Sequence, residues 1–249
     1  MSATRWTMLL TVVLGASSFV GSKSVAGSTI LSDCYRQSPD DELLSGARSR
    51  AVPMPSTALT MWTNDRLPRL NAYDAECVAK FAIAPPPALA DEMLRGDVML
   101  LSANLQGFCR DLYTECLTIV TVNAGTLPMM GFIEAMGSAG LELNRVNPKW
   151  KSIRADFDRF GFDVGQALTA AAAAPGGVTK ATHQLRLQHI AALNEWRNYA
   201  AHALTNPPIG GPLALATVTA WKNSCDGLAT QLDGALYDQV LSLTGSPPW

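Results

Sequence analysis

The residues best suited to chemistry in this sequence are an arginine, an asparagine and a histidine near residue 200. Arg197 is followed at once by Asn198, and His202 comes four residues after the asparagine, which gives the pattern R-N-x-x-x-H. On a helix Asn198 and His202 share a face. Arg197 and His202 lie roughly 7.5 Å apart along an ideal helix and about 140° apart around it. One helix therefore brings them together poorly unless it relaxes near Pro207, whereas two copies facing each other in a symmetric dimer do so more easily.

The chemistry open to this set is cleavage of an RNA phosphodiester bond. A neutral imidazole can take the proton of a ribose 2′-hydroxyl, and an imidazolium can protonate the leaving 5′-oxygen. A guanidinium binds phosphate oxygens through two parallel hydrogen bonds and stabilises the extra negative charge of the transition state. The asparagine amide can orient the imidazole or hold the phosphate. This route needs no metal and no cofactor, and DNA is inert to it because DNA lacks the 2′-hydroxyl.

A purely structural interpretation of the pattern stays open. Arg197 can be a surface charge paired with Glu195 or a neighbour, and His202 can lie near a helix C-terminus, where the helix dipole favours a cation. The chain has three histidines and five scattered cysteines without a C-x-x-C pair. These numbers argue against a multi-histidine metal centre, a zinc finger and a disulfide scaffold.

Composition limits the function classes further. Of 249 residues 48% are hydrophobic and 16% charged, so the chain can bury a sizeable core. Nineteen Lys and Arg against 21 Asp and Glu give a net charge of −2, so bulk attraction to nucleic acid is not the driving feature. Any contact with RNA must come from a local site. The glycine-rich phosphate-binding motifs of P-loop and dinucleotide-binding proteins are absent from the sequence.

Residues 1–60 differ from the rest and are expected to form an irregular N-terminal extension. Residues 7–20 are an apolar run that is too short to span a bilayer comfortably. The segment can be an export signal cleaved near Ala26, a disordered extension, or translated sequence upstream of a later start. Because the region that follows has intracellular features, we expect a cytoplasmic protein, with export as the alternative if residues 1–26 are a signal peptide.

Residues 61–249 are expected to form one all-α domain, an up-and-down bundle of about four to five helices with short connections. No stretch shows sustained two-residue alternation, so no sheet is expected. Asn147 and Thr179 are expected to cap helices, and Pro212 to open the last one. The expected helical segments are residues 62–81, 88–122, 127–139, 148–160, 180–205 and 212–243, with residues 170–177 as a mobile connection.

Residues 197–202 resemble the R-x4–6-H signature of the HEPN superfamily, in which a polar residue commonly follows the arginine. Residues 98–112 resemble the long first core helix of the RiboL-PSP-HEPN branch, residues 149–162 its middle helix and residues 212–243 its last helix. The resemblance covers about residues 61–243, and only the R-N-x-x-x-H element is sharply specific.

The resemblance implies a helical bundle that forms a homodimer and acts as a metal-independent endoribonuclease. Arg197 and His202 would be catalytic, with Asn198 assisting. Many members are toxins of toxin–antitoxin pairs or antiviral effectors, so RNA and an antitoxin protein are the implied partners. In one departure, Gln106 stands where the branch commonly has an acidic residue, and activity is reduced if that carboxylate tunes the histidine. We expect no membrane partner for residues 61–249.

A basic group precedes the motif in the sequence. Lys149, Lys151 and Arg154 are candidate RNA contacts, with Trp150 available to stack on a base. The alternative, which the sequence favours, is that the aromatic residues belong to the core and the charges form a solvated face. Three functions therefore stay open: a HEPN-type endoribonuclease, a non-catalytic HEPN-like module that binds RNA or protein, and an exported helical protein in which the arginine and histidine are incidental.

Overall fold

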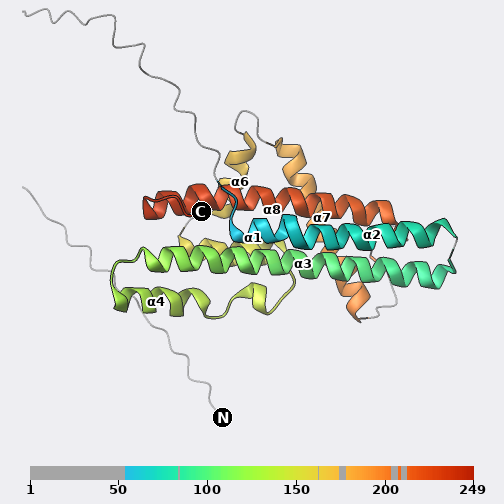
Figure 1. The fold of residues 1–249 in the computed structure, drawn as a ribbon, viewed down its shortest axis with the longest axis horizontal. Helices are drawn as coiled ribbons and strands as arrows, with labels where there is room; N and C mark the ends of the chain where they lie inside the picture. Colours follow the sequence, from blue (N-terminus) through green and yellow to red (C-terminus); the bar gives the residue numbers. More distant parts are fainter. Residues whose placement is uncertain (1–53, 84, 162, 174–177, 203–206, 209–211) are drawn as a thin grey trace, which may run out of the picture. The chain divides into compact units, whose positions relative to one another are not determined.

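The protein is described from a computed structural model, which covers residues 54–83, 85–161, 163–173, 178–202, 207–208 and 212–249. These residues form helices, turns and loops and contain no strand, so the predicted all-α class is confirmed. Figure 1 shows α2 and α3 running side by side, with α8 along the same bundle. The elements are α1 (Thr57–Met61), the π-helical turn η2 (Trp62–Arg66), α2 (Leu67–Ala82), α3 (Pro87–Val122), α4 (Leu127–Ser138), the 3-10 turn η3 (Glu142–Asn144), α5 (Trp150–Phe157), the 3-10 turn η4 (Asp158–Phe160), α6 (Val164–Ala173), α7 (Lys180–His202) and α8 (Leu215–Thr244).

The core lies where α3, α7 and α8 pack on one another. The apolar stripe predicted on the long helix is buried there, and the stripe predicted on the last helix meets it. Burial of these side chains supplies the main favourable free energy of the fold. The buried members of the two stripes are Leu94, Val98, Leu101, Leu105, Phe108, Leu112 and Cys116 on α3, and Val218, Trp221, Leu228, Leu232, Leu236 and Val240 on α8.

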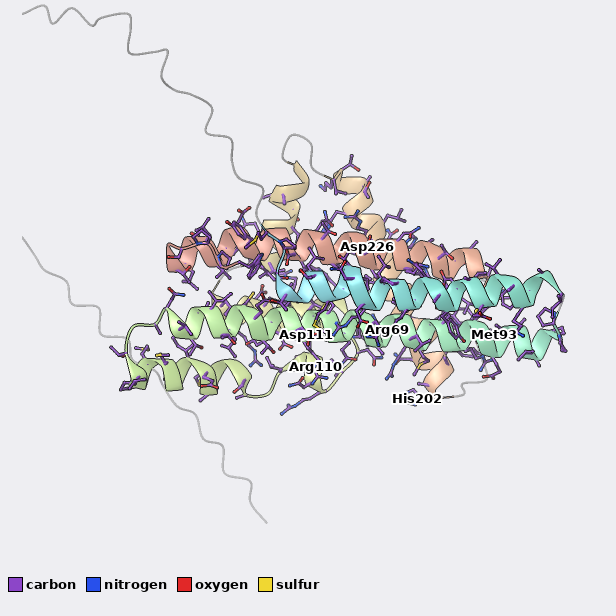
Figure 2. The ribbon with its side chains drawn as sticks, in the orientation of Figure 1. Arg69, Met93, Arg110, Asp111, His202 and Asp226 are labelled. Atoms are coloured by element: carbon purple, nitrogen blue, oxygen red, sulfur yellow. The ribbon has the colours of Figure 1, made fainter. Side chains whose placement is uncertain are left out.

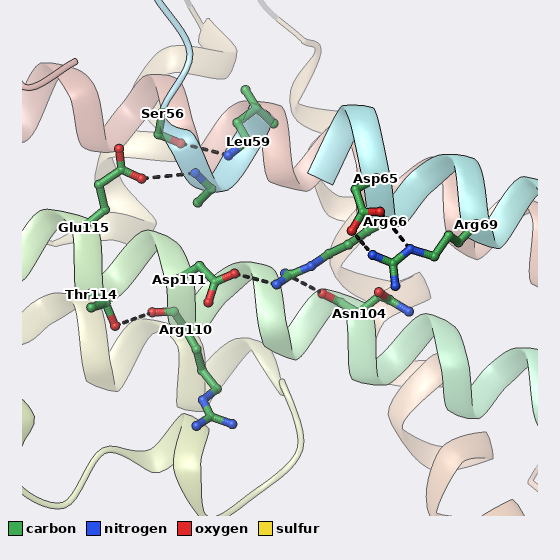
Figure 3. Close-up of polar contacts among 11 residues, drawn as sticks. Ser56, Leu59, Asp65, Arg66, Arg69, Asn104, Arg110, Asp111, Thr114 and Glu115 are labelled. Carbon is green, nitrogen blue, oxygen red and sulfur yellow. Dashed lines mark hydrogen bonds and ion pairs between the residues drawn. The ribbon is translucent and has the colours of Figure 1, made fainter. Parts of the chain in front are cut away.

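The packed domain starts earlier than the predicted boundary at residue 61. Ser56 is buried; its hydroxyl accepts a hydrogen bond from Leu59 N at 3.0 Å, and its backbone N–H donates to Asp233 at 3.2 Å. The Glu115 carboxylate accepts from the first two N–H groups of α1, and Figure 3 draws one of these hydrogen bonds. The start of α1 is thus fixed by acidic side chains from distant elements, which local periodicity does not show.

Two further contacts tie the first helices to the bundle. The Trp62 indole N–H donates to Asp226 on α8 at 2.9 Å, and Figure 2 shows the position of Asp226 on that helix. Arg66 forms an ion pair with Asp111 and donates to the Asn104 carbonyl on α3 (Figure 3). These contacts hold η2 between α3 and α8.

Three local expectations are corrected. Residues 170–173 belong to α6, which extends to Ala173, and are not part of a connection; residues 174–177 lie outside the described residues. Asn147 does not cap α5, whose N-cap residue is Lys149, and Pro212 precedes the last helix, which begins at Leu215. The predicted cap of α7 is present, since Thr179 Oγ1 accepts a hydrogen bond from Thr182 N at 3.2 Å.

A buried charged cluster lies among α2, α3 and α8. Lys222 forms an ion pair with Asp74, and Asp97 lies near both with 1% of its surface exposed. Burial raises the pKa of Asp97 to about 7; the Asp74 carboxylate adds to the rise and Lys222 opposes it. The cluster therefore holds two carboxyl groups against one ammonium. None of the described helices is both long enough and apolar enough to cross a membrane.

Candidate functional site

The R-N-x-x-x-H residues lie at the C-terminal end of α7. Figure 2 shows His202 where α7 emerges beyond α3 in the view. The helix continues without interruption through His202, so the relaxation that would bring Arg197 toward His202 does not occur within α7. The separation expected for an ideal helix, about 140° around the axis, therefore applies.

The motif is anchored by its neighbours and is open to solvent itself. Trp196 and Tyr199 are buried and pack edge to face, with their ring centroids 5.3 Å apart. His202 is exposed, and Arg197 and Asn198 are partly exposed. The Arg197 and His202 side chains form no ion pair or hydrogen bond with another described residue, so the pairing of Arg197 with Glu195 considered above is not observed.

Asn198 is held by Asn147, which was predicted from the sequence to cap a helix. Asn147 Nδ2 donates to Asn198 Oδ1 at 2.6 Å, and this hydrogen bond replaces the expected capping role of Asn147. One turn earlier on α7, the buried Asn194 donates to the Pro148 carbonyl at 3.2 Å. The loop before α5 thus lies along α7. The Asn198 carbonyl oxygen accepts this hydrogen bond, and the amide nitrogen, which is the donor of the side chain, can donate to a phosphate oxygen.

Gln106 fixes the same loop from the other side. Its amide nitrogen donates to the carbonyl oxygens of Leu143, at 2.6 Å, and Val146, at 3.0 Å, and the next residue of the loop is Asn147. An ionised carboxylate has no proton to donate to these carbonyls. The amide at this position therefore supports the loop that contacts the motif, a task that the acidic residue expected from the HEPN resemblance would not perform.

A further cation lies beside the motif. The Arg95 guanidinium stacks over the Tyr199 ring, 4.7 Å from its centroid, and donates to the Tyr199 hydroxyl at 3.1 Å. Arg95 also pairs with Asp91 at 2.6 Å. No sequence pattern pointed to Arg95, because α3 brings it to α7 from about a hundred positions away in the chain.

The three candidate RNA contacts differ in their surroundings. Lys149 and Lys151 are exposed at the start of α5. Arg154 pairs with Asp163 at 3.0 Å and with Asp158 at 3.6 Å, so its charge is locally balanced. Lys149 and Lys151 therefore have no ion-pair partner among the described residues and lie in or beside the loop that holds Asn198, whereas Arg154 belongs to an ion-pair network.

No group of three or more metal-binding side chains occurs within the described ranges. Comparison with models of protein families, with curated proteins and with solved structures gives no match for this chain. The site is thus defined by its own residues: a partly exposed guanidinium, an amide oriented by a neighbouring amide, and an exposed imidazole at one end of an all-α bundle. A sequence signal for the contact with the loop does exist, because Asn194, Asn198 and His202 recur every four residues on one face of α7.

Proposed function

We propose that this protein is a metal-independent endoribonuclease of the HEPN type. The observation that carries the proposal is that His202 is exposed and Arg197 partly exposed at the end of α7, while the neighbouring Trp196 and Tyr199 are buried. A reactive pair needs this combination, since the reacting groups must reach a substrate and the helix that carries them must be rigid.

The proposed catalyst is a homodimer with the two motifs facing one shared cleft. One α7 directs Arg197 and His202 to different sides, so two copies are needed to surround a phosphate with both residue types. In this arrangement each subunit supplies one imidazole, one guanidinium and one asparagine amide.

The reaction is an internal transfer within RNA. The imidazole of one His202 takes the 2′-hydroxyl proton, and the 2′-oxygen forms a bond to phosphorus. The bond from phosphorus to the 5′-oxygen breaks, and that oxygen takes a proton from the imidazolium of the other His202. The products are a 2′,3′-cyclic phosphate and a free 5′-hydroxyl. The Arg197 side chains stabilise the charge on the non-bridging oxygens, and Asn198 Nδ2 donates to one of them.

A cytoplasmic toxin or antiviral effector is the biological role that we propose for this activity, with an antitoxin protein as a partner. The proposal follows from the resemblance of residues 197–202 to the HEPN signature. The alternatives are a non-catalytic module, which predicts RNA or protein binding without cleavage, and an exported helical protein, which predicts a mature N-terminus near residue 26.

The direct test is cleavage of RNA by the purified full chain in EDTA, beside Arg197→Ala and His202→Ala. We expect His202→Ala to lower the rate about 10²–10⁴-fold, the usual contribution of an acid–base group. We expect Arg197→Ala to lower it about 10²–10³-fold, the usual effect of losing one donor to the transition-state charge. Lys80→Ala, on the exposed end of α2, and His189→Gln, on the same helix as the motif, are the matched controls and should keep the activity. Equal cleavage by the wild type and both motif variants would reject the mechanism, and RNA binding without cleavage would favour the module.

A further inference from the structure

A second site lies on α7, toward its N-terminal end. It is a pocket of about 680 Å³ between α5, α6 and α7, a size within the usual range of small-ligand sites. Its lining includes the indole of Trp150, the ion pair of Arg154 and Asp163, and the side chains of Gln166, Lys180 and Gln184. None of the R-N-x-x-x-H residues contributes to it.

Side-chain contacts hold the walls of the pocket in place. Trp150 packs edge-on against the buried His183, with ring centroids 6.4 Å apart. Asp163 accepts from Arg154 at 3.0 Å and from the backbone N–H of Gln166 at 3.0 Å, which links α5 to the first turn of α6. The indole and the guanidinium are therefore both positioned before any ligand arrives.

The chemistry of the lining suits an uncharged, flat and polar group. An aromatic side chain stacks on any nucleobase, and a guanidinium plane does the same. Amide side chains such as Gln166 and Gln184 donate to and accept from the edges of a base. Because Arg154 and Asp163 cancel in charge, the pocket interior carries little net charge, while the exposed Lys180 at its edge can meet a phosphate.

The pocket and the motif lie along one side of α7. At 100° per residue, the pocket residues Lys180, Gln184 and Leu187 fall within about 40° of Asn198 around the helix, and Gln184 is about 21 Å from Asn198 along it. The segment 147–150 follows this side of α7, from Asn198 past Asn194 to His183. It carries the exposed Lys149, and Lys151 comes next, so positive charge lines the route between the two sites.

We propose that this pocket binds an unpaired nucleobase of the RNA, several nucleotides from the bond that is cleaved, with Trp150 as the stacking surface and Lys180 on the adjoining phosphate. The proposal rests on the proposed ribonuclease function and makes single-stranded RNA the substrate class. It assigns Lys149 and Lys151 to the phosphates between the two sites.

The test measures binding, so that it does not depend on catalysis. The probe is a fluorescent 2′-O-methyl oligoribonucleotide of about eight nucleotides, which resists 2′-hydroxyl attack and is long enough for a single-strand site. Fluorescence anisotropy with the full chain gives its affinity. We expect Trp150→Leu to weaken binding at least about tenfold, as loss of one base stack does. We expect Lys180→Gln to weaken it about threefold and to reduce its dependence on salt.

Controls separate the pocket from general effects. Lys80→Gln removes an exposed lysine from α2 and should leave the affinity unchanged. If Trp150→Leu does not fold, the exposed Lys180→Gln and Gln184→Ala variants, together with ultraviolet cross-linking of the oligonucleotide to Trp150, replace it. Weaker binding by these variants supports the pocket, even if the wild type cleaves no RNA. Absence of cleavage by the wild type would contradict only the ribonuclease proposal. No binding by the wild type, or equal binding by all variants, overturns the pocket.

Discussion

At the scale of single residues, the motif depends on a neighbour that the pattern itself does not contain. From the resemblance, Gln106 is expected to reduce activity, since an acidic residue that can tune the histidine is common at its position. The structure gives Gln106 two backbone carbonyls to hold, those of Leu143 and Val146, next to the residue that contacts Asn198. The side chain at position 106 therefore affects the stability of the loop, in addition to any effect on the histidine.

Gln106→Glu should consequently destabilise the protein. At pH 8 the carboxylate cannot donate to the two carbonyls and repels them, which should lower the free energy of unfolding by about 1–2 kcal/mol. Part of the loss should return near pH 4, where a protonated carboxyl can donate again. Urea unfolding at both pH values measures this, with Gln188→Glu, at an exposed position of α7, as the control. A stabilised variant with higher ribonuclease activity would instead support the role that the resemblance gives to an acid.

Whether a contact of the site could be predicted from the sequence depends on how far apart its two residues are along the chain. The R-N-x-x-x-H pattern is local and was visible, and its position on a helix was predicted. Its contacts with Asn147 and Arg95 join residues 51 and 104 positions apart, so the four-residue recurrence on α7 can mark the contacting face but cannot identify the partner residues. Whether Arg197 and His202 are catalytic stays a prediction until the variants are assayed.

At the scale of the elements, two glycines on α8 differ in how closely neighbouring side chains approach them. Glycine inside a helix usually costs about 1 kcal/mol relative to alanine. The Arg186 guanidinium lies directly on Gly227 and donates to its carbonyl oxygen at 3.0 Å, and a Cβ at Gly227 would overlap the guanidinium. At Gly234, on the same helix, a Cβ would meet nothing within 4 Å. The two positions therefore differ in packing and share the same helix.

Gly234→Ala should stabilise the protein by up to about 1 kcal/mol, because it gains helix propensity in open space. Gly227→Ala should forfeit this gain, since Arg186 must leave its hydrogen bond, and should be at least about 1 kcal/mol less stable than Gly234→Ala. Chemical denaturation of the two variants gives the comparison. Equal stability would mean that Arg186 moves aside without cost and that its contact with α8 is incidental.

The elements that the sequence predicted well are those with a long apolar stripe. The long helix was expected at 88–122 and runs from Pro87 to Val122. The missed elements are short or lack a stripe: α1 has five residues and depends on Glu115, and α6 ends in an alanine run without a strong apolar period. In α4 the apolar residues predicted a helix correctly. They did not indicate that none of its side chains is buried.

At the scale of the whole molecule, the shared cleft makes a prediction about mixed dimers. If both motifs serve one cleft, a wild-type subunit paired with an Arg197→Ala/His202→Ala subunit is inactive. Refolding wild type with about nine parts of the double variant should then lower the activity per wild-type subunit about tenfold, because few wild-type pairs remain. The same excess of His189→Gln should leave it unchanged. Undiminished activity per wild-type subunit would show that one motif suffices and would remove the reason for a dimeric site.

The buried cluster of Asp74, Asp97 and Lys222 should set how stability of the whole fold varies with pH. Its charges do not balance, and Asp97 Oδ2 has no hydrogen-bond partner within the described residues. Burial first, and the Asp74 carboxylate second, raise the pKa of Asp97 from 3.8 to about 7. Between these values the folded chain keeps a proton that the unfolded chain has released. The contribution of Asp97 to stability is therefore complete below about pH 4 and is lost as the pH rises to about 7.

Asp97→Asn tests this, since the amide keeps the shape of the side chain and cannot ionise. The wild type should lose stability between pH 5 and pH 8, and the variant should lose markedly less and be more stable than the wild type at pH 8, by about 1–2 kcal/mol. Urea unfolding at a series of pH values measures both slopes, with Glu76→Gln, an exposed acid on α2, as the control. An equal loss of stability in Asp97→Asn and in the wild type between pH 5 and pH 8 would mean that Asp97 is already ionised in the folded chain over this range and that Lys222 stabilises both carboxylates together.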